Sequence, residues 1–284
     1  MHRIVRTAGA AVAMLVVAFQ ARAADVSVLY AGSLVNLMEH GIGSAFDGTG
    51  RDRFVGYGGG SNALANQIKG HLRRADVFIS ATPRVNDTLM GAANGDRVAW
   101  YVTFAQSPLV IAYNPSTRFA AELKSKPWYE VLREPGIRIG RTDPTQDPKG
   151  RLTLQLLQRA EQVYHQPGLA RSVLGAPGNP AQVRPEESLT GRMQSGEIDV
   201  GFFYSTEATD LKLPSVAPAP EVATGARYTV TILRDAADPA GAARYVSFLL
   251  GAQGQAIMHR HGLDTVTPVL TGNRAAVPAE LHLQ

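Results

Sequence analysis

The chain contains no cysteine. It therefore has no disulfide framework, no zinc or iron–sulfur site built on thiolates, no cysteine nucleophile and no lipidated cysteine. Charged residues make up only 18% of the chain and apolar residues 45%, a balance that is typical of globular proteins and argues against disorder or a coiled coil. A length of 284 residues gives room for about two domains, or for one large divided domain.

The sequence also lacks an apolar run long enough to cross a bilayer, and its N-terminal run has the three parts of a secretory signal peptide. Arg3 and Arg6 precede an uncharged stretch over 7–20, and a small-x-small cleavage site ends at Ala23. A membrane anchor is the alternative, but the stretch is shorter than the roughly 20 apolar residues that a spanning helix needs. We expect residues 1–23 to be a cleaved signal peptide and the mature chain to be periplasmic, without membrane insertion.

An excess of positive charge is largely confined to that signal. The whole chain carries a formal charge of +4 and has a pI near 9.4, which would suit a nucleic-acid partner. Cleavage after Ala23 removes three arginines and no acidic residue, which leaves +1. We therefore expect no nucleic-acid partner.

Strand and helix signals alternate along the mature chain. Apolar runs predict strands at 26–31, 54–57, 77–80, 109–113, 137–140, 200–204 and 228–233. Helical spacing and capping residues predict helices at 34–46, 62–69, from Pro83, at 152–164, 239–250 and 252–261. This alternation predicts an α/β fold with mostly parallel sheets.

Two strand-to-helix junctions combine glycine with serine. Gly32-Ser33 follows the first predicted strand, and Gly60-Ser61 follows the second. Ligands of open α/β sheets lie at the carboxyl ends of strands, where helix N-termini present free N–H groups and the positive end of the helix dipole. We consider these four residues candidate ligand contacts. The alternative is that each serine only caps a helix, as Ser61 could do for 62–69.

A third junction, at 142–150, is acidic. Asp143 and Asp147 both precede proline, so they could approach a ligand or could only shape turns and cap the helix that begins near Gly150. Lys149 could offset the acidic loop, but we expect it on a solvated turn.

Six stretches of the mature chain resemble a known family in the same order. They are YAGSL (30–34), GGGSNALANQIKG (58–70), ADVFISATPR (75–84), GRTDPTQDPKG (140–150), GEIDVGFFYSTEA (196–208) and AARYVSFLLGAQGQAIMHRHGL (242–263). The sequence resembles the type II solute-binding proteins of ABC importers, specifically the molybdate/tungstate-binding family.

The resemblance implies two α/β lobes joined by a two-strand hinge, with ligand enclosed in the cleft between them. Lobe 1 would comprise 24–107 and 226–284, and lobe 2 would comprise 108–225. The crossing strands would lie near 104–110 and 226–233.

Site residues carried over from the resemblance come from both lobes. Ser33 and Ser61 would bind oxyanion oxygens from lobe 1. Asp143 or Asp147, together with Tyr204 or Glu207 in the stretch 204–207, would approach from lobe 2.

A carboxylate repels an oxyanion, by about 4 kcal/mol at 4 Å and an effective dielectric of 20. The family resemblance implies that carboxylates bind the central metal of the oxyanion instead, which sulfate and phosphate do not permit readily. Asp143, Asp147 and Glu207 are the candidates for that contact. The expected partners are a small oxyanion and an ABC permease in the inner membrane; the chain would be a monomer with no cofactor and no free metal ion.

The same residues also suit other functions. A different ligand is possible, such as sulfate, ferric iron or a chelate, a small cation, or an amine-bearing or other organic solute; a periplasmic sensor module would share the fold. A hydrolase is disfavoured, because Gly59-Gly60-Ser61-Asn62-Ala63 lacks the second glycine of a nucleophile elbow and no His-Glu-x-x-His run occurs. We therefore expect no catalytic residues.

Overall fold

The computed structural model describes residues 24–281 and 283. The predicted signal peptide lies outside these residues. Within them, no helix is long and apolar enough to cross a membrane.

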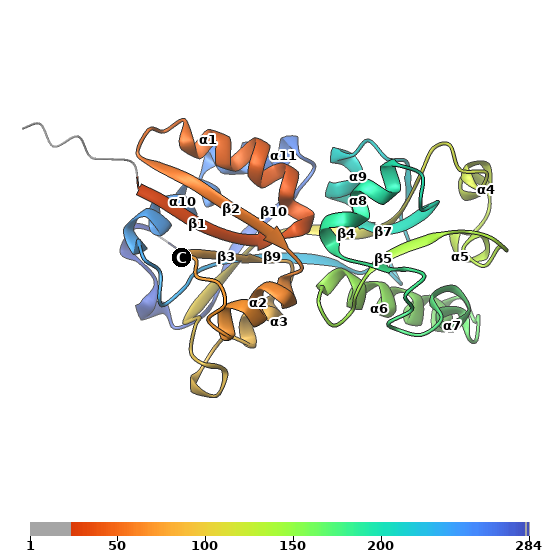
Figure 1. Ribbon diagram of the computed structural model, residues 1–284, viewed down its shortest axis with the longest axis horizontal. Helices are drawn as coiled ribbons and strands as arrows, with labels where there is room; N and C mark the ends of the chain where they lie inside the picture. Colours follow the sequence, from red (N-terminus) through yellow and green to blue (C-terminus); the bar gives the residue numbers. More distant parts are fainter. Residues whose placement is uncertain (1–23, 282, 284) are drawn as a thin grey trace, which may run out of the picture.

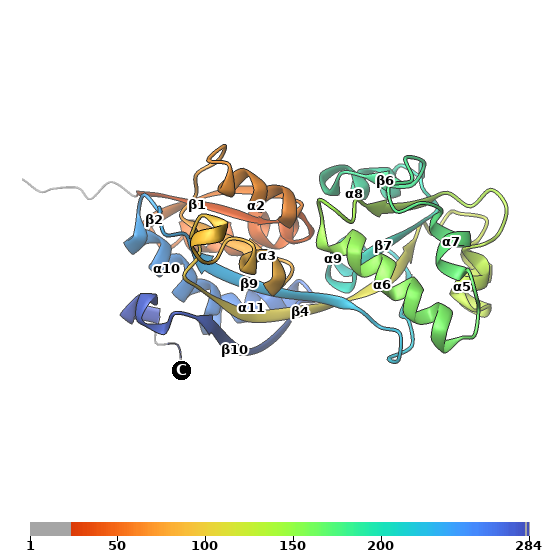
Figure 2. The same ribbon diagram turned by 90° about the horizontal axis from the view of Figure 1, so that it is seen from below.

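Two lobes lie side by side along the long axis of the molecule (Figure 1). One hydrogen-bonded sheet runs through both lobes in the order β2-β1-β3-β9-β4-β7-β5-β6, and β10 and β8 each pair with β4. Helices cover both faces of the sheet in each lobe (Figures 1 and 2). The predicted α/β, two-lobe architecture is confirmed.

The lobe that holds the first strands, lobe 1, is built from both ends of the chain. Its strands are β1 (Ala24–Ala31), β2 (Asp52–Gly59), β3 (Val77–Ser80), most of β9 (Gly225–Ile232) and β10 (Asp264–Gly272). Its helices are η1 (Gly32–Leu34), η2 (Leu37–Gly43), α1 (Ser44–Asp47), α2 (Ser61–Lys69), α3 (Pro83–Asp87), η3 (Ala92–Asn94), α10 (Pro239–Leu250), α11 (Ala252–Arg260), η4 (Arg274–Ala276) and η5 (Ala279–Leu281).

Lobe 2 is built from the middle of the chain. Its strands are β5 (Ile139–Thr142), β6 (Val183–Arg184), β7 (Val200–Tyr204) and β8 (Ser215–Val216). Its helices are α4 (Ala120–Ser125), α5 (Trp128–Val131), α6 (Pro148–Val163), α7 (Leu169–Leu174), α8 (Glu186–Gln194) and α9 (Ser205–Asp210).

Two antiparallel strands connect the lobes. β4 (Trp100–Tyr113) pairs with β9 and β10 through its first part and with β7 and β8 through its last part. Every antiparallel pair of named strands involves β4 or β9, whereas β1 pairs in parallel with β2 and β3, and β5 with β6 and β7. Each lobe therefore has a parallel centre, as predicted, and the antiparallel pairs come from the connecting strands.

One predicted helix has a different form. The segment 34–46 was expected to be regular α-helix, but 37–43 is a π-helix that continues into the short α1. Glycines allow close packing there: a Cβ at Gly43 would lie 2.4 Å from the ring of Phe54, and one at Gly41 would lie 2.8 Å from Ile257. Hydrophobic periodicity detects the buried face of such a segment but does not distinguish the two helix types.

Candidate functional site

The two serine junctions lie next to each other because of strand register. β1 and β2 are parallel, and Ala31 at the end of β1 pairs with Gly59 at the end of β2. Gly32-Ser33 and Gly60-Ser61 therefore leave neighbouring strands at the same edge of the sheet, which faces lobe 2 (Figure 1).

Ser33 meets a tyrosine that the sequence analysis did not select. Its Oγ lies 3.0 Å from the hydroxyl of Tyr228, a fully buried residue of β9. Either hydroxyl can donate in this pair, and the other retains a proton for a further acceptor. Tyr228 lies in the predicted strand 228–233, and no sequence motif around it indicates a functional hydroxyl.

Ser61 does not cap α2, so the capping alternative is wrong for this serine. Gly60 occupies the N-cap position and Ser61 is the first helical residue. The fully buried Oγ of Ser61 instead accepts a hydrogen bond of 3.1 Å from the backbone N–H of Ala81. A hydroxyl that accepts in this way still has its own proton to donate to a ligand.

The loop before α6 closes against the Gly60-Ser61 junction. The carbonyl of Gln146 accepts from the N–H of Ala63 at 3.1 Å, and Asn62 donates to the carbonyl of Thr145 at 3.0 Å. A Cβ at Gly60 would lie 2.9 Å from the Gln146 carbonyl oxygen, so glycine is needed for this approach. A cavity of about 300 Å³ remains beside the contact, lined from both lobes by residues that include Gly60, Asp143, Asp147 and Glu186.

Asp143 and Asp147 occupy different environments. Asp143 Oδ1 accepts from the backbone N–H and the hydroxyl of Thr145, at 2.7 and 2.6 Å, and these hydrogen bonds lower the pKa of its carboxyl. Asp147 is buried and caps α6 by accepting a hydrogen bond of 2.8 Å from the backbone N–H of Lys149. Its carboxylate also accepts a hydrogen bond of 3.0 Å from Thr142 Oγ1. Both aspartates therefore make the contacts expected if they only shape a turn or cap a helix. Of the two, Asp147 is buried and Asp143 is partly exposed.

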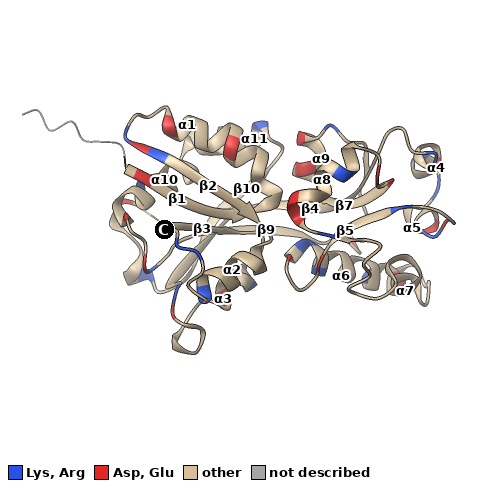
Figure 3. Ribbon diagram, viewed as in Figure 1, with Lys and Arg blue, Asp and Glu red and all other residues tan. Residues whose placement is uncertain are grey.

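The expectation that Lys149 lies on a solvated turn is wrong. Its side chain is 1% exposed, and its Nζ lies 2.9 Å from Oε1 of Glu186 and 2.8 and 2.9 Å from the two carboxylate oxygens of Glu207. Lys149 is buried because α6 begins at the edge of the sheet that faces lobe 1. There, α8 and α9 enclose the first turn of α6. Figure 3 shows acidic colour at the end of α8 that faces lobe 1.

The side chains around Lys149 form a buried cluster of four residues, Asp147, Lys149, Glu186 and Glu207. Burial is the largest single influence on the pKa of each of them. Burial, together with the negative charge of Glu186, raises the pKa of Asp147 to about 7. Burial and the charge of Glu207 raise that of Glu186 to about 7, although Lys149 opposes the shift. Burial lowers the pKa of Lys149, but the charges of Glu186 and Glu207 outweigh it and hold the ammonium protonated.

Tyr204 and Glu207 are joined at the start of α9. Tyr204 is the N-cap residue, and its backbone N–H donates to Oε2 of Glu207 at 2.8 Å. The Tyr204 hydroxyl is buried without a hydrogen-bond partner. Burial raises the pKa of this phenol well above its usual value, and the charge of Asp147 adds to the effect.

The candidate set is thus divided. The structure brings together Gly32, Ser33, Gly60, Ser61, Asp147, Tyr204 and Glu207 where the lobes meet. Asp143 is held in its own turn at the edge of this region. Sequence reasoning missed Tyr228 and Glu186, and it misplaced Lys149.

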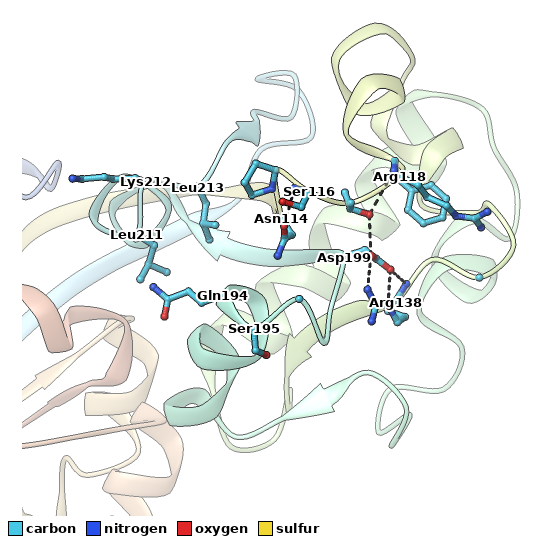
Figure 4. A pocket seen from close by; sticks show the side chains of 15 residues that line it. Asn114, Ser116, Arg118, Arg138, Gln194, Ser195, Asp199, Leu211, Lys212 and Leu213 are labelled. Atoms are coloured by element: carbon cyan, nitrogen blue, oxygen red, sulfur yellow. Dashed lines mark hydrogen bonds and ion pairs between the residues drawn. The ribbon is translucent and has the colours of Figure 1, made fainter.

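A second cavity lies elsewhere in lobe 2. It measures about 850 Å³ and is lined by residues that include Arg118, Arg138, Asp199 and Lys212 (Figure 4). Asp199 is already bound by Thr117 and by the backbone and guanidinium of Arg138, with contacts of 2.7–2.9 Å. Its central polar groups therefore satisfy one another and do not point to a ligand.

Among residues 24–281 and 283, no group of three or more His, Cys, Asp or Glu side chains is arranged to hold a metal ion. Two of the buried carboxylates, Glu186 and Glu207, instead bind the ammonium of Lys149.

Two lobes joined by two antiparallel strands are the fold of the type II periplasmic binding proteins. A model of the bacterial extracellular solute-binding protein family matches residues 26–264, and the chain belongs to this family.

Similar proteins support this assignment. An uncharacterized solute-binding protein of Petrotoga mobilis is 29% identical, covering 91% of this chain and 89% of that protein. The molybdate/tungstate-binding protein WtpA of Thermococcus kodakarensis is 26% identical, over 81% of this chain and 77% of that protein. The solved structure of the Azotobacter vinelandii periplasmic molybdate-binding protein has a TM-score of 0.64 at 19% identity, covering 84% of this chain and 98% of that chain.

Proposed function

We propose that this protein is the exported solute-binding component of an ABC importer and that it captures a small oxyanion of the molybdate or tungstate kind between its lobes. The observation that carries the proposal is that two buried serine hydroxyls of lobe 1, Ser33 and Ser61, and two buried carboxyl groups of lobe 2, Asp147 and Glu207, lie on elements that meet where the lobes meet. The names of its relatives support the same ligand class.

The ligand chemistry follows from this mixed set of groups. Hydrogen bonds from neutral hydroxyls to a charged oxyanion contribute about 1.5–3 kcal/mol each. Carboxylates at the same place disfavour an oxyanion that binds through its oxygens alone, and they favour one whose central metal accepts further oxygen ligands. Tyr204 and Tyr228 would supply further hydroxyls.

We further propose that binding proceeds by closure of two rigid lobes, 24–107 with 226–284 against 108–225, about β4 and β9. Delivery to an inner-membrane permease requires export, which the predicted signal peptide would provide. Capture and release would be the whole activity, without a catalytic step. Turnover of chromogenic esters that is lost on Ser61→Ala would contradict this part of the proposal.

A second ligand class has its own supporting observation. The cluster holds three carboxyl groups and one ammonium, from Asp147, Glu186, Glu207 and Lys149, and an excess of carboxylates suits a small cation or an amine-bearing solute.

One experiment separates the two classes. The purified mature protein is unfolded thermally in the presence of molybdate, tungstate, sulfate, phosphate, ferric iron or an amine-bearing organic solute. A ligand at 100 times its dissociation constant stabilises the fold by about 2.7 kcal/mol, which raises Tm by several degrees in a chain of this size. We expect a shift with molybdate and tungstate and a smaller one with sulfate; a shift with the amine or iron alone would overturn the oxyanion proposal.

A further inference from the structure

Glu186 has one carboxylate oxygen that the protein leaves without a partner. Oε1 accepts from Lys149 Nζ at 2.9 Å, whereas the buried Oε2 has no hydrogen-bond partner. The nearby Tyr204 hydroxyl is also buried and unpartnered. Buried polar atoms are paired in the great majority of native structures, so two unpaired ones in a single cluster indicate a place for a bound group.

Glu186 belongs to lobe 2 but lies against the first serine junction of lobe 1. A Cβ at Gly32 would lie 2.5 Å from the Cγ of Glu186. Gly32 immediately precedes Ser33, so the unpaired oxygen lies in the region where we place the oxyanion.

The titratable groups around Glu186 come from four elements. Lys149 and the capping Asp147 come from the start of α6, Glu207 from α9, and the phenols Tyr204 and Tyr228 from β7 and β9. The adjoining η1 contributes no titratable side chain. Glu187, next to Glu186 on α8, is exposed but lies against Gly59 of lobe 1, and Asp143 lines the same cavity. With every carboxyl ionised and the ammonium charged, this cluster would carry two net negative charges before any oxyanion arrived.

Hydrogen bonding decides which carboxyl holds a proton. Glu207 accepts three contacts from the ammonium of Lys149 and the N–H of Tyr204. Asp147 accepts two, from Thr142 and from the N–H of Lys149. Donors of this kind stabilise the ionised form. Glu186 has one donor, Lys149, and its contact with the Glu207 carboxyl raises its pKa further, so Glu186 is the group best suited to be neutral.

We propose that Glu186 is protonated in the oxyanion-bound protein and that its Oε2–H donates a hydrogen bond to the ligand, so that capture of a dianion at neutral pH takes up one proton. This inference rests on the proposed function. Burial and the charge of Glu207, which raise the pKa of Glu186 to about 7, support it.

The direction of the pH effect follows from proton linkage. A group that binds a proton more tightly in the complex than in the free protein strengthens binding as pH falls. Above the pKa of Glu186 in the free protein, we expect the affinity for molybdate to fall by up to about tenfold per pH unit, until the bound form also loses the proton.

The test is calorimetric titration of the mature protein with sodium molybdate at pH 7.5, in phosphate-free buffers of different ionisation enthalpy. The dependence of the observed enthalpy on that ionisation enthalpy counts protons. We expect uptake of up to one proton by the wild type. For Glu186→Gln we expect none, with binding retained and a flatter pH profile, because the amide supplies a permanent donor.

Glu221→Gln is the control, because it makes the same change at an exposed position of lobe 2 that does not line this cavity. It should take up as many protons as the wild type. Binding of molybdate by the wild type without proton uptake, or equal uptake by Glu186→Gln, would overturn this inference and leave the proposed function standing. Absence of molybdate binding by the wild type at every pH would overturn both.

Discussion

The side chains of His261 and Asp210 contact each other between the two lobes. Nδ1 of His261, which follows α11 in lobe 1, lies 3.1 Å from Oδ1 of Asp210 at the end of α9 in lobe 2. Gly262 lies next to Thr209 at the same contact, where its positive φ of 72° allows the turn to fit against α9. This contact lies outside the cluster around Lys149 and joins α9 of lobe 2 to the segment after α11 of lobe 1.

Removing this contact should weaken ligand capture without altering the cluster. A partly exposed polar contact of this kind contributes at most about 1 kcal/mol, so Asp210→Asn and His261→Gln are each expected to reduce molybdate affinity by up to about fivefold. Calorimetric titration measures the effect, and small-angle scattering would show a larger radius of gyration at subsaturating ligand. Arg53→Gln, which breaks an exposed pair with Asp25 inside lobe 1, serves as the control; an equal loss in that variant would contradict a role in closure.

The two serines should contribute separately to affinity. Loss of one hydrogen bond to a charged oxyanion weakens binding by about 1.5–3 kcal/mol, or roughly 10- to 150-fold. We expect losses in this range for Ser33→Ala and for Ser61→Ala, measured by titration with molybdate. Ser61→Ala should also lower Tm, because it leaves the Ala81 N–H without its acceptor. Ser195→Ala, at an exposed position of lobe 2, should change neither quantity, and unchanged affinity in both site variants would refute the site assignment.

Asp147, and not Asp143, should discriminate between oxyanions. Asparagine caps helices as well as aspartate does, so Asp147→Asn removes the ionisable carboxyl from a buried position while keeping the contact with α6. We expect this variant to lose molybdate affinity more than tenfold and sulfate affinity much less. The same change at Asp143, which is held in an exposed turn by Thr145, should have little effect. Equal losses for both anions in Asp147→Asn would contradict a contact to the central metal.

Lys149 should be essential for stability, because it is the ammonium shared by two buried carboxylates. Removing one partner from a buried ion pair destabilises a protein by about 3–5 kcal/mol, so Lys149→Met should lower Tm by roughly 10 °C. Adding Glu186→Gln and Glu207→Gln to the same chain should restore part of the loss, since it removes the unpaired charges. Calorimetric unfolding measures both effects; no recovery in the triple variant would show that packing, and not charge, explains the loss.

Local patterns were sufficient for much of the fold. The predicted strands 77–80 and 200–204 coincide with β3 and β7, and the helix predicted at 239–250 coincides with α10. These segments have strong apolar runs or clear start signals. β10 was not predicted, because its side chains are mostly exposed or half-buried and show no alternation.

The candidate site was predicted in part, and the errors have a common cause. Ser33 and Ser61 were found because glycine and serine at strand ends form a recognisable local signal. Lys149 was assigned to solvent because three elements far apart in the sequence enclose it. Glu186 and Tyr228 have no local signal at all, since only the contact between lobes gives them a role.

The sequence by itself determined the α/β class, the two serine junctions at strand ends and the family, because each depends on local order along the chain. The tertiary structure decided which charges are buried together. It placed Lys149 between Glu186 and Glu207 and separated Asp147 from Asp143. Electrostatic interactions depend on distance and on the exclusion of water, and neither quantity can be obtained from separation along the chain.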